Sequence, residues 1–142
     1  MFDTLSAQVG AGLTVIVVAF AFLKGDEPER IASGSYVLGW FASLLIQEDR
    51  GSGGTQWGLM AIDAIMLGVF VALAWKSRRT WPAWASALQS LVVTSHVLTL
   101  VDIRPPLWAF YAAINLASAG ILLTIAIGTF WAWQDRRAAG LE

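Results

Sequence analysis

Long apolar segments alternate with short polar connectors along almost the whole chain. The apolar segments run from Leu5 to Leu23, Ile31 to Gln47, Gln56 to Trp75, Trp81 to Val101, and Leu107 to Trp133. Each is close to the length of about 20 apolar residues that one helical membrane crossing requires. The pattern predicts an all-α fold, a polytopic bundle of five transmembrane helices with short loops. Residues 1–142 then form a single transmembrane domain.

Prolines mark the boundaries between these segments. Pro28, Pro82, Pro105 and Pro106 all fall at or just before a predicted helix start, where a proline removes no helical hydrogen bond. The connectors are so short that consecutive helices should pack as antiparallel neighbours. No Lys or Arg precedes the first apolar segment, so we expect it to be a retained span and not a cleaved signal peptide.

Basic residues gather on one side of the predicted membrane topology. With five spans, one side holds seven of them and the other holds only Arg50 and Arg104; the seven are Lys24, Arg30, Lys76, Arg78, Arg79, Arg136 and Arg137. Short cytoplasmic loops carry the excess of Lys and Arg, which predicts an outside N-terminus and a cytoplasmic C-terminus. If the weakest, second segment lay outside the bilayer, the basic clusters would instead be mixed across both faces.

Tryptophans repeat this map. We expect them to form aromatic belts at the two membrane interfaces. The cytoplasmic belt would hold Trp75, Trp81, Trp84, Trp131 and Trp133, and the outer belt Trp57 and Trp108.

Composition removes several classes of function. The chain is 57% hydrophobic and only 13% charged, which is too apolar for a soluble domain of this size. It has no cysteine and one histidine, so thiolate chemistry and multi-histidine metal sites are excluded within one chain. A net charge of −1 with no basic arm argues against nucleic acid as a partner. No phosphate loop, serine elbow or pair of catalytic carboxylates is present, so we expect no enzyme activity.

Three polar residues lie at one predicted depth in three different spans. Asp63, His96 and Asn115 each stand six or seven residues from the outer boundary, about 10 Å into the bilayer. Gln89 shares a helical stripe with His96, and Tyr111 shares one with Asn115. An ionisable residue inside a membrane normally faces a partner, so we hypothesise one intramembrane polar cluster. It could act as packing glue between helices, as a proton or ion relay, or as a small-molecule site.

Two further binding hypotheses follow from the residue types. His96 could be an axial ligand of a chlorophyll-type pigment or a haem, although no cofactor and no other metal site is predicted. The basic cluster could contact an anionic lipid headgroup. Its members are Lys76, Arg78, Arg79, Arg136 and Arg137.

Three features of the sequence carry a resemblance to known proteins. They are Gly25-Asp26-Glu27-Pro28-Glu29-Arg30-Ile31, Asp63, and Lys76-Ser77-Arg78-Arg79-Thr80-Trp81-Pro82 followed by Gln89 and His96. In these features the chain resembles a group of small multi-pass inner-membrane proteins of Gram-negative bacteria. The resemblance would cover most of the chain from Gly25 onward. It implies helical architecture and a location in the bacterial inner (cytoplasmic) membrane, and it carries over no activity or binding residues.

Three functions remain open at this point. The first is an accessory or scaffold subunit that packs against other subunits of an inner-membrane complex, because lipid-facing helix faces are its main surfaces. The second is a small oligomeric transporter, channel or membrane effector that uses Asp63, His96 and Asn115. The third is pigment or haem binding through His96. The expected partners are membrane lipids and other membrane subunits or further copies of the chain.

Overall fold

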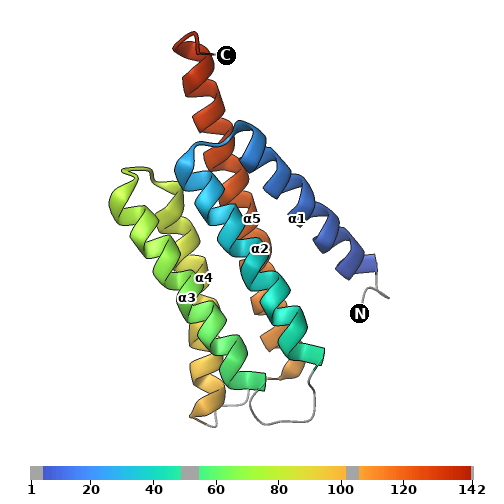
Figure 1. Cartoon of the computed structure of the whole chain (residues 1–142). Helices are drawn as coiled ribbons and strands as arrows, with labels where there is room; N and C mark the ends of the chain where they lie inside the picture. The colour runs from blue at the N-terminus through green and yellow to red at the C-terminus, as the bar shows by residue number, and fades with distance from the viewer. Residues whose placement is uncertain (1–4, 49–54, 102–105, 142) are drawn as a thin grey trace.

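Five helices account for nearly all of the described chain. The computed structural model describes residues 5–48, 55–101 and 106–141 (Figure 1). The helices are α1 (Leu5–Lys24), α2 (Glu27–Glu48), α3 (Thr55–Lys76), α4 (Trp81–Leu100) and α5 (Leu107–Ala138). No strand occurs within these ranges, so the predicted all-α class is confirmed.

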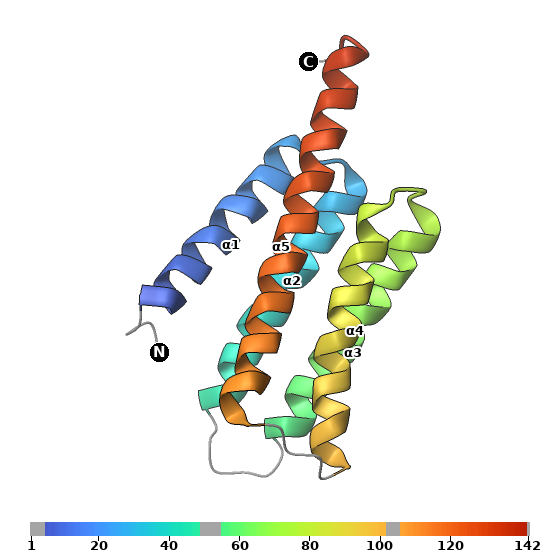
Figure 2. The same ribbon diagram turned by 180° about the vertical axis from the view of Figure 1, so that it is seen from behind.

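The helices form an up-and-down bundle in which each packs beside the next one along the chain. α5 returns to pack against α1 and touches α2 across the bundle (Figures 1 and 2). α1 leans away from the other helices toward its N-terminal end, and the C-terminal end of α5 extends beyond them. The chain leaves α1, α3 and α5 at the same end of the bundle, where α2 and α4 begin. We call this end, which holds Lys24, Arg79 and Arg136, the basic end.

Two helices extend by several residues beyond the apolar segments that predicted them. α2 begins at Glu27, four residues before Ile31, because Asp26 and Glu29 form a cap for it. The Asp26 backbone N–H donates to Glu29 Oε2 at 3.0 Å, the reach-back bond of a capping box. α5 continues past Trp133 to Ala138, because polar residues can prolong a helix into water where hydropathy no longer indicates it. Arg50 and Arg104 lie outside the described residues.

Three helices are long and apolar enough to cross a membrane. The qualifying segments are Trp57–Lys76 in α3, Trp81–Leu100 in α4 and Trp108–Ala138 in α5. Within the described residues α1 contributes the shorter apolar helix Gln8–Lys24. The outer faces carry many large exposed apolar side chains, among them Leu38, Leu45 and Leu116. This surface suits lipid or another apolar helix better than water.

Most predicted belt tryptophans lie at helix ends and are exposed. Trp57 and Trp108 lie near the ends away from the basic end, and Trp75, Trp84 and Trp131 lie toward it. Trp81 differs from the prediction, because its indole is buried inside the bundle and belongs to the core.

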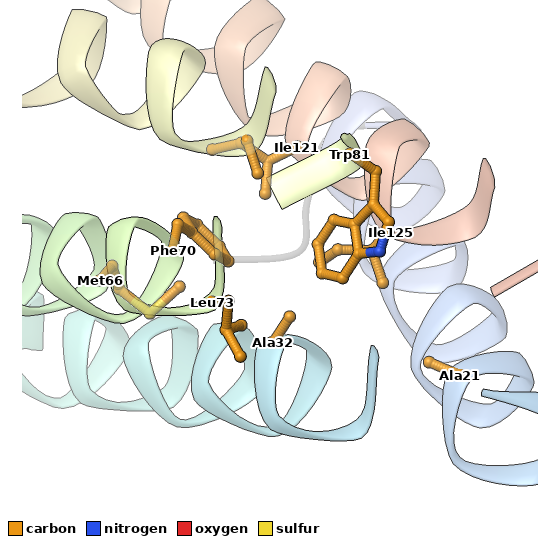
Figure 3. Packing of buried hydrophobic residues seen from close by; sticks show 9 residues of the cluster. Ala21, Ala32, Met66, Phe70, Leu73, Trp81, Ile121 and Ile125 are labelled. Atoms are coloured by element: carbon orange, nitrogen blue, oxygen red, sulfur yellow. The ribbon is translucent and has the colours of Figure 1, made fainter. Parts of the chain in front are cut away.

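The core fills the middle of the bundle with side chains from all five helices (Figure 3). Met66, Phe70 and Leu73 recur at three- and four-residue spacing on α3, which places them on one face. They pack with side chains of the other helices: Ala21, Ala32, Trp81, Ala85, Ile121 and Ile125. Close packing matters here because lipid is as apolar as these side chains, so helices associate through contact and not through exclusion of water.

Gly128 on α5 should be intolerant of any side chain. A Cβ built there would lie 2.5 Å from Trp81 Cδ1, and the buried Trp81 ring is held by a hydrogen bond to Glu29. We expect Gly128→Ala to lower the free energy of unfolding by about 1–3 kcal/mol, the usual cost of overpacking. Unfolding by SDS titration, followed by tryptophan fluorescence, measures this. Gly10→Ala is the matched control, because a Cβ there meets nothing within 4 Å; equal losses in both variants would contradict the packing argument.

Candidate functional site

The first polar site lies inside the bundle between α3 and α4. Asp63 on α3 accepts hydrogen bonds from two α4 side chains, one on each carboxylate oxygen. Gln89 Nε2 donates to Oδ1 at 2.9 Å, and His96 Nε2 lies 2.9 Å from Oδ2. Gln89 also donates to the backbone carbonyl of Asp63 at 3.1 Å. We call Asp63, Gln89 and His96 the inner polar cluster.

The helical repeat explains why these residues meet. Gln89 and His96 stand seven residues apart, which is two turns, so both point from α4 toward α3. The His96 side chain is 8% exposed and that of Asp63 is 25% exposed. With the carboxylate ionised, His96 Nε2 must carry a hydrogen and donate it. Tyr36 of α2 and Ser118 of α5 lie close to each other beside this cluster.

The structure does not bring Asn115 and Tyr111 into the inner polar cluster. Asn115 is exposed, and Tyr111 is 59% exposed. The buried face of α5 begins at Ala117 and continues through Ile121 and Ile125. Asn115 lies two residues before Ala117, about 200° around the helix, and therefore faces outward. Contact requires both a similar depth along the bundle and a helix rotation that turns the side chain inward. Asn115 does not have the inward rotation.

The environment of His96 also bears on cofactor binding. Asp63 occupies Nε2, which leaves only Nδ1 for a haem or chlorophyll metal. The ring of Phe110 packs against the imidazole edge to face, with centroids 6.2 Å apart. A carboxylate on one ring nitrogen is common for histidines that bind a metal through the other, so pigment or haem binding by His96 stays a prediction and would use Nδ1.

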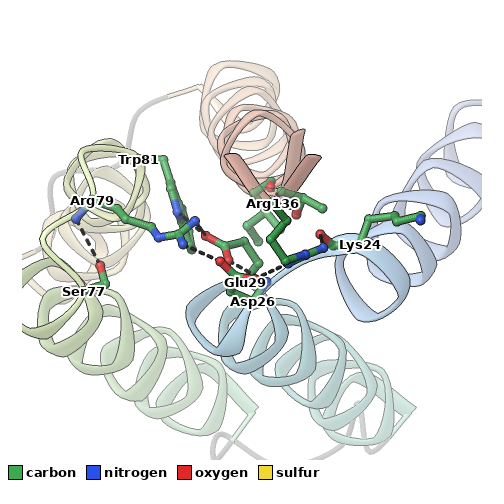
Figure 4. A network of polar contacts seen from close by, with 9 residues as sticks. Lys24, Asp26, Glu29, Ser77, Arg79, Trp81 and Arg136 are labelled. Carbon is green, nitrogen blue, oxygen red and sulfur yellow. Dashed lines mark hydrogen bonds and ion pairs between the residues drawn. The ribbon is translucent and has the colours of Figure 1, made fainter. Parts of the chain in front are cut away.

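The second polar site lies at the basic end, where side chains from the starts of α2 and α4 and from the end of α5 meet (Figure 4). Its centre is Glu29, whose side chain is 0% exposed. Glu29 Oε1 accepts hydrogen bonds from Arg79 Nη1 at 3.0 Å and from Trp81 Nε1 at 2.8 Å. Asp26 accepts from Arg79 and from Arg136. We call these five residues the basic-end network.

This network connects chain segments that are far apart in the sequence. Asp26 lies in the α1–α2 connector and Glu29 in the first turn of α2. Arg79 lies in the α3–α4 connector, Trp81 begins α4, and Arg136 lies near the end of α5. Arg136 Nη2 also donates to the Lys24 carbonyl at 2.6 Å, which ties the end of α1 into it. Among the described residues, no buried side-chain nitrogen or oxygen lacks a hydrogen-bond partner.

The basic residues thus divide into two groups that sequence alone does not separate. Arg79 and Arg136, which we expected at a lipid headgroup, are held by carboxylates. Arg137 lies over the Trp133 ring, 5.3 Å from its centroid, while Lys76 and Arg78 are exposed. The overlooked signal was that Asp26 and Glu29 stand in a connector on the same side as seven basic residues.

Comparison with known proteins supplies no relative. No protein-family model matches the chain, and no curated protein or solved structure matches it.

Removing the charge of Glu29 should weaken the whole bundle. Glu29→Gln keeps the shape but takes the buried anion away from Arg79. Breaking a fully buried ion pair costs about 3–5 kcal/mol. We expect a smaller loss, because Arg79 is 28% exposed and keeps Asp26. The free energy of unfolding from SDS titration measures this loss. Glu27→Gln, an exposed acid in the same helical turn, should change little; similar values for the two variants would contradict a central role for Glu29.

Proposed function

We propose that this chain is a non-enzymatic protein of the bacterial inner membrane that crosses the bilayer five times and serves as an accessory or scaffold subunit. In this proposal it packs against other integral membrane subunits or further copies of itself. The basic end faces the cytoplasm, with the N-terminus outside.

One observation carries the scaffold role. The core side chains Phe70, Leu73, Ala85, Ile121 and Ile125, which we call the apolar plug, lie between the inner polar cluster and the basic-end network. On α3, Phe70 is seven residues from Asp63, about 10 Å toward the basic end. A transport path needs polar groups or water along its length. The apolar plug instead separates the inner polar cluster from the basic-end network, and this arrangement favours a scaffold over a transport path.

The outer face of α3 is the surface we expect a partner helix to use. Ala64, Gly68 and Ala72 are exposed at four-residue spacing, with Ala61 nearby. A Cβ at Gly68 would meet nothing within 4 Å, so this chain leaves the space beside Gly68 unfilled. Small residues at such spacing let two membrane helices approach closely. Exposed Ile65 and Val71 flank the row and offer apolar contact.

The topology rests on the same charge argument as before. Lys24, Arg79 and Arg136 lie at one end of the bundle, as the positive-inside rule requires of a cytoplasmic side. α2 is less apolar than the three qualifying helices, but its polar first turn belongs to the basic-end network at the membrane surface.

A proton relay is the second candidate, and a specific contact favours it. Asp63 and His96 form an acid–imidazole pair at 2.9 Å within two apolar helices, and such pairs can exchange a proton. The relay would require the apolar plug to open.

Filling the space at Gly68 tests the scaffold role. We expect Gly68→Ile to remove the partner subunits that co-migrate with the tagged protein after extraction from its host in mild detergent, because the added side chain keeps the partner helix away. Gly12→Ile on α1, an equally open glycine on a helix that does not contact α3, is the control. The proposal fails if the wild-type protein migrates as a lone monomer, or if both variants retain the partners equally.

Proton flux separates the two candidates. In liposomes carrying a pH-sensitive dye, we expect the wild-type protein and Asp63→Asn to leak protons no faster than protein-free vesicles. Asparagine can still accept from Gln89, so the fold should survive. If the wild-type protein conducted protons and both Asp63→Asn and His96→Leu abolished the flux, the relay would replace the scaffold role.

A further inference from the structure

A groove runs along the seam between α4 and α5, starting at the basic end. The two helices lie side by side on the face shown in Figure 2. The hollow at the basic end has a volume of about 670 Å³. Its walls include Arg78, Trp84, Leu88, Trp131 and Asp135. It is therefore apolar and aromatic along its sides, with three charged residues, Arg78, Arg79 and Asp135, at its mouth.

Two of these three charged side chains, Arg78 and Asp135, make no ion pair within the described part of the chain. In the part of the chain that the structure describes, Arg79 is committed to Asp26 and Glu29, whereas Arg78 and Asp135 are exposed and form no side-chain ion pair. Arg78 also has a positive φ of 53°, a conformation that costs energy for a residue other than glycine. Such strain is often found at binding sites, so this geometry adds to the case for a ligand at Arg78.

The tryptophans place the mouth at the level of lipid headgroups. Trp84 and Trp131 are exposed on its two walls, one from each helix. Tryptophan prefers the boundary between headgroups and acyl chains. Trp81 forms part of the lining from inside the bundle and is fixed there by its bond to Glu29, so the groove is preformed.

The groove continues toward the middle of the bundle. A second hollow of about 300 Å³ follows on the same two helices, lined by Leu91, Leu98 and Leu116, and Leu88 lines both hollows. Leu91 stands ten residues after Trp81, about 15 Å along α4. This is half of the bilayer hydrocarbon thickness of about 30 Å, the depth that one acyl chain spans.

We propose that the α4–α5 groove binds one glycerophospholipid with a phosphoethanolamine headgroup. The phosphate pairs with Arg78, the ammonium group pairs with Asp135, and an acyl chain lies along Leu88 toward Leu91. A zwitterionic headgroup fits because it supplies one charge for each of the two unpaired side chains, and a primary ammonium group can donate hydrogen bonds to the Asp135 carboxylate, which a quaternary one cannot. A purely anionic headgroup would leave Asp135 beside a negative charge. The proposal rests on the membrane placement of α4 and α5, and it is independent of the partner face on α3.

Native mass spectrometry of the purified full chain tests this site. After delipidation, the protein is titrated with phosphatidylethanolamine, phosphatidylglycerol or phosphatidylcholine of identical acyl chains. We expect one phosphatidylethanolamine to bind most tightly. Arg78→Gln and Asp135→Asn should each weaken its apparent Kd about ten-fold, because each removes one charge-assisted contact. Arg137→Gln, whose side chain lies over Trp133, should leave the Kd unchanged.

Each alternative result overturns the proposal. Equal affinity for all three lipids would mean that the groove binds acyl chains and does not distinguish between headgroups. Tighter binding of phosphatidylglycerol, with no effect of Asp135→Asn, would mean an anionic lipid. Equal weakening by Arg137→Gln would mean non-specific charge attraction. Gel filtration of each variant before titration confirms that it is folded. Loss of partners in Gly68→Ile is measured in a separate experiment, so failure of the subunit role cannot be mistaken for failure of this site.

Discussion

The structure depends on the buried carboxylate of Glu29. A charge held at the edge of a membrane bundle is costly unless it is paired and hydrogen-bonded. Glu29 meets this need with Arg79, Trp81 and the Asp26 backbone N–H, which together give both carboxylate oxygens a partner. These partners come from the α1–α2 connector, the α3–α4 connector and the first residue of α4. Satisfying one side chain therefore fixes how α2, α3 and α4 stand relative to one another.

The relative position of α3 and α4 along the bundle also determines which of their side chains meet in the interior. α3 ends and α4 begins beside Glu29, so their side chains are in register from the basic end onward. On α3, the inward-facing residues Leu73, Phe70 and Met66 lead from the basic end to Asp63. On α4, Ala85 is followed in the same direction by Gln89 and His96. Apolar contacts then close the intervening space. Asp63, Gln89 and His96 meet because α3 and α4 are held together at the basic end and run side by side from there.

Hydropathy predicted the helices well and the polar contacts only in part. All five apolar segments became helices, because backbone hydrogen bonding in an apolar medium leaves few other choices. Depth from the boundary placed Asp63 and His96 at one level, and the structure has them in contact. The same depth argument included Asn115, which faces outward, because a single sequence gives each helix a hydrophobic stripe too weak to fix its rotation. For the pairing of Glu29 with Arg79, fifty residues away, the sequence offers only the shared side of the predicted topology, which does not say which acid meets which base.

The distribution of paired and unpaired groups connects the fold to the proposed roles. Polar side chains inside the bundle bond to one another, and apolar core side chains fill the space between Asp63 and Glu29. Unfilled space and unpaired charges lie on the outer surface. They are the row of small residues around Gly68 and the groove with Arg78 and Asp135 at its mouth. The proposed roles follow this division, because the partner helix and the phospholipid would both fill positions on the outer surface that this chain leaves open.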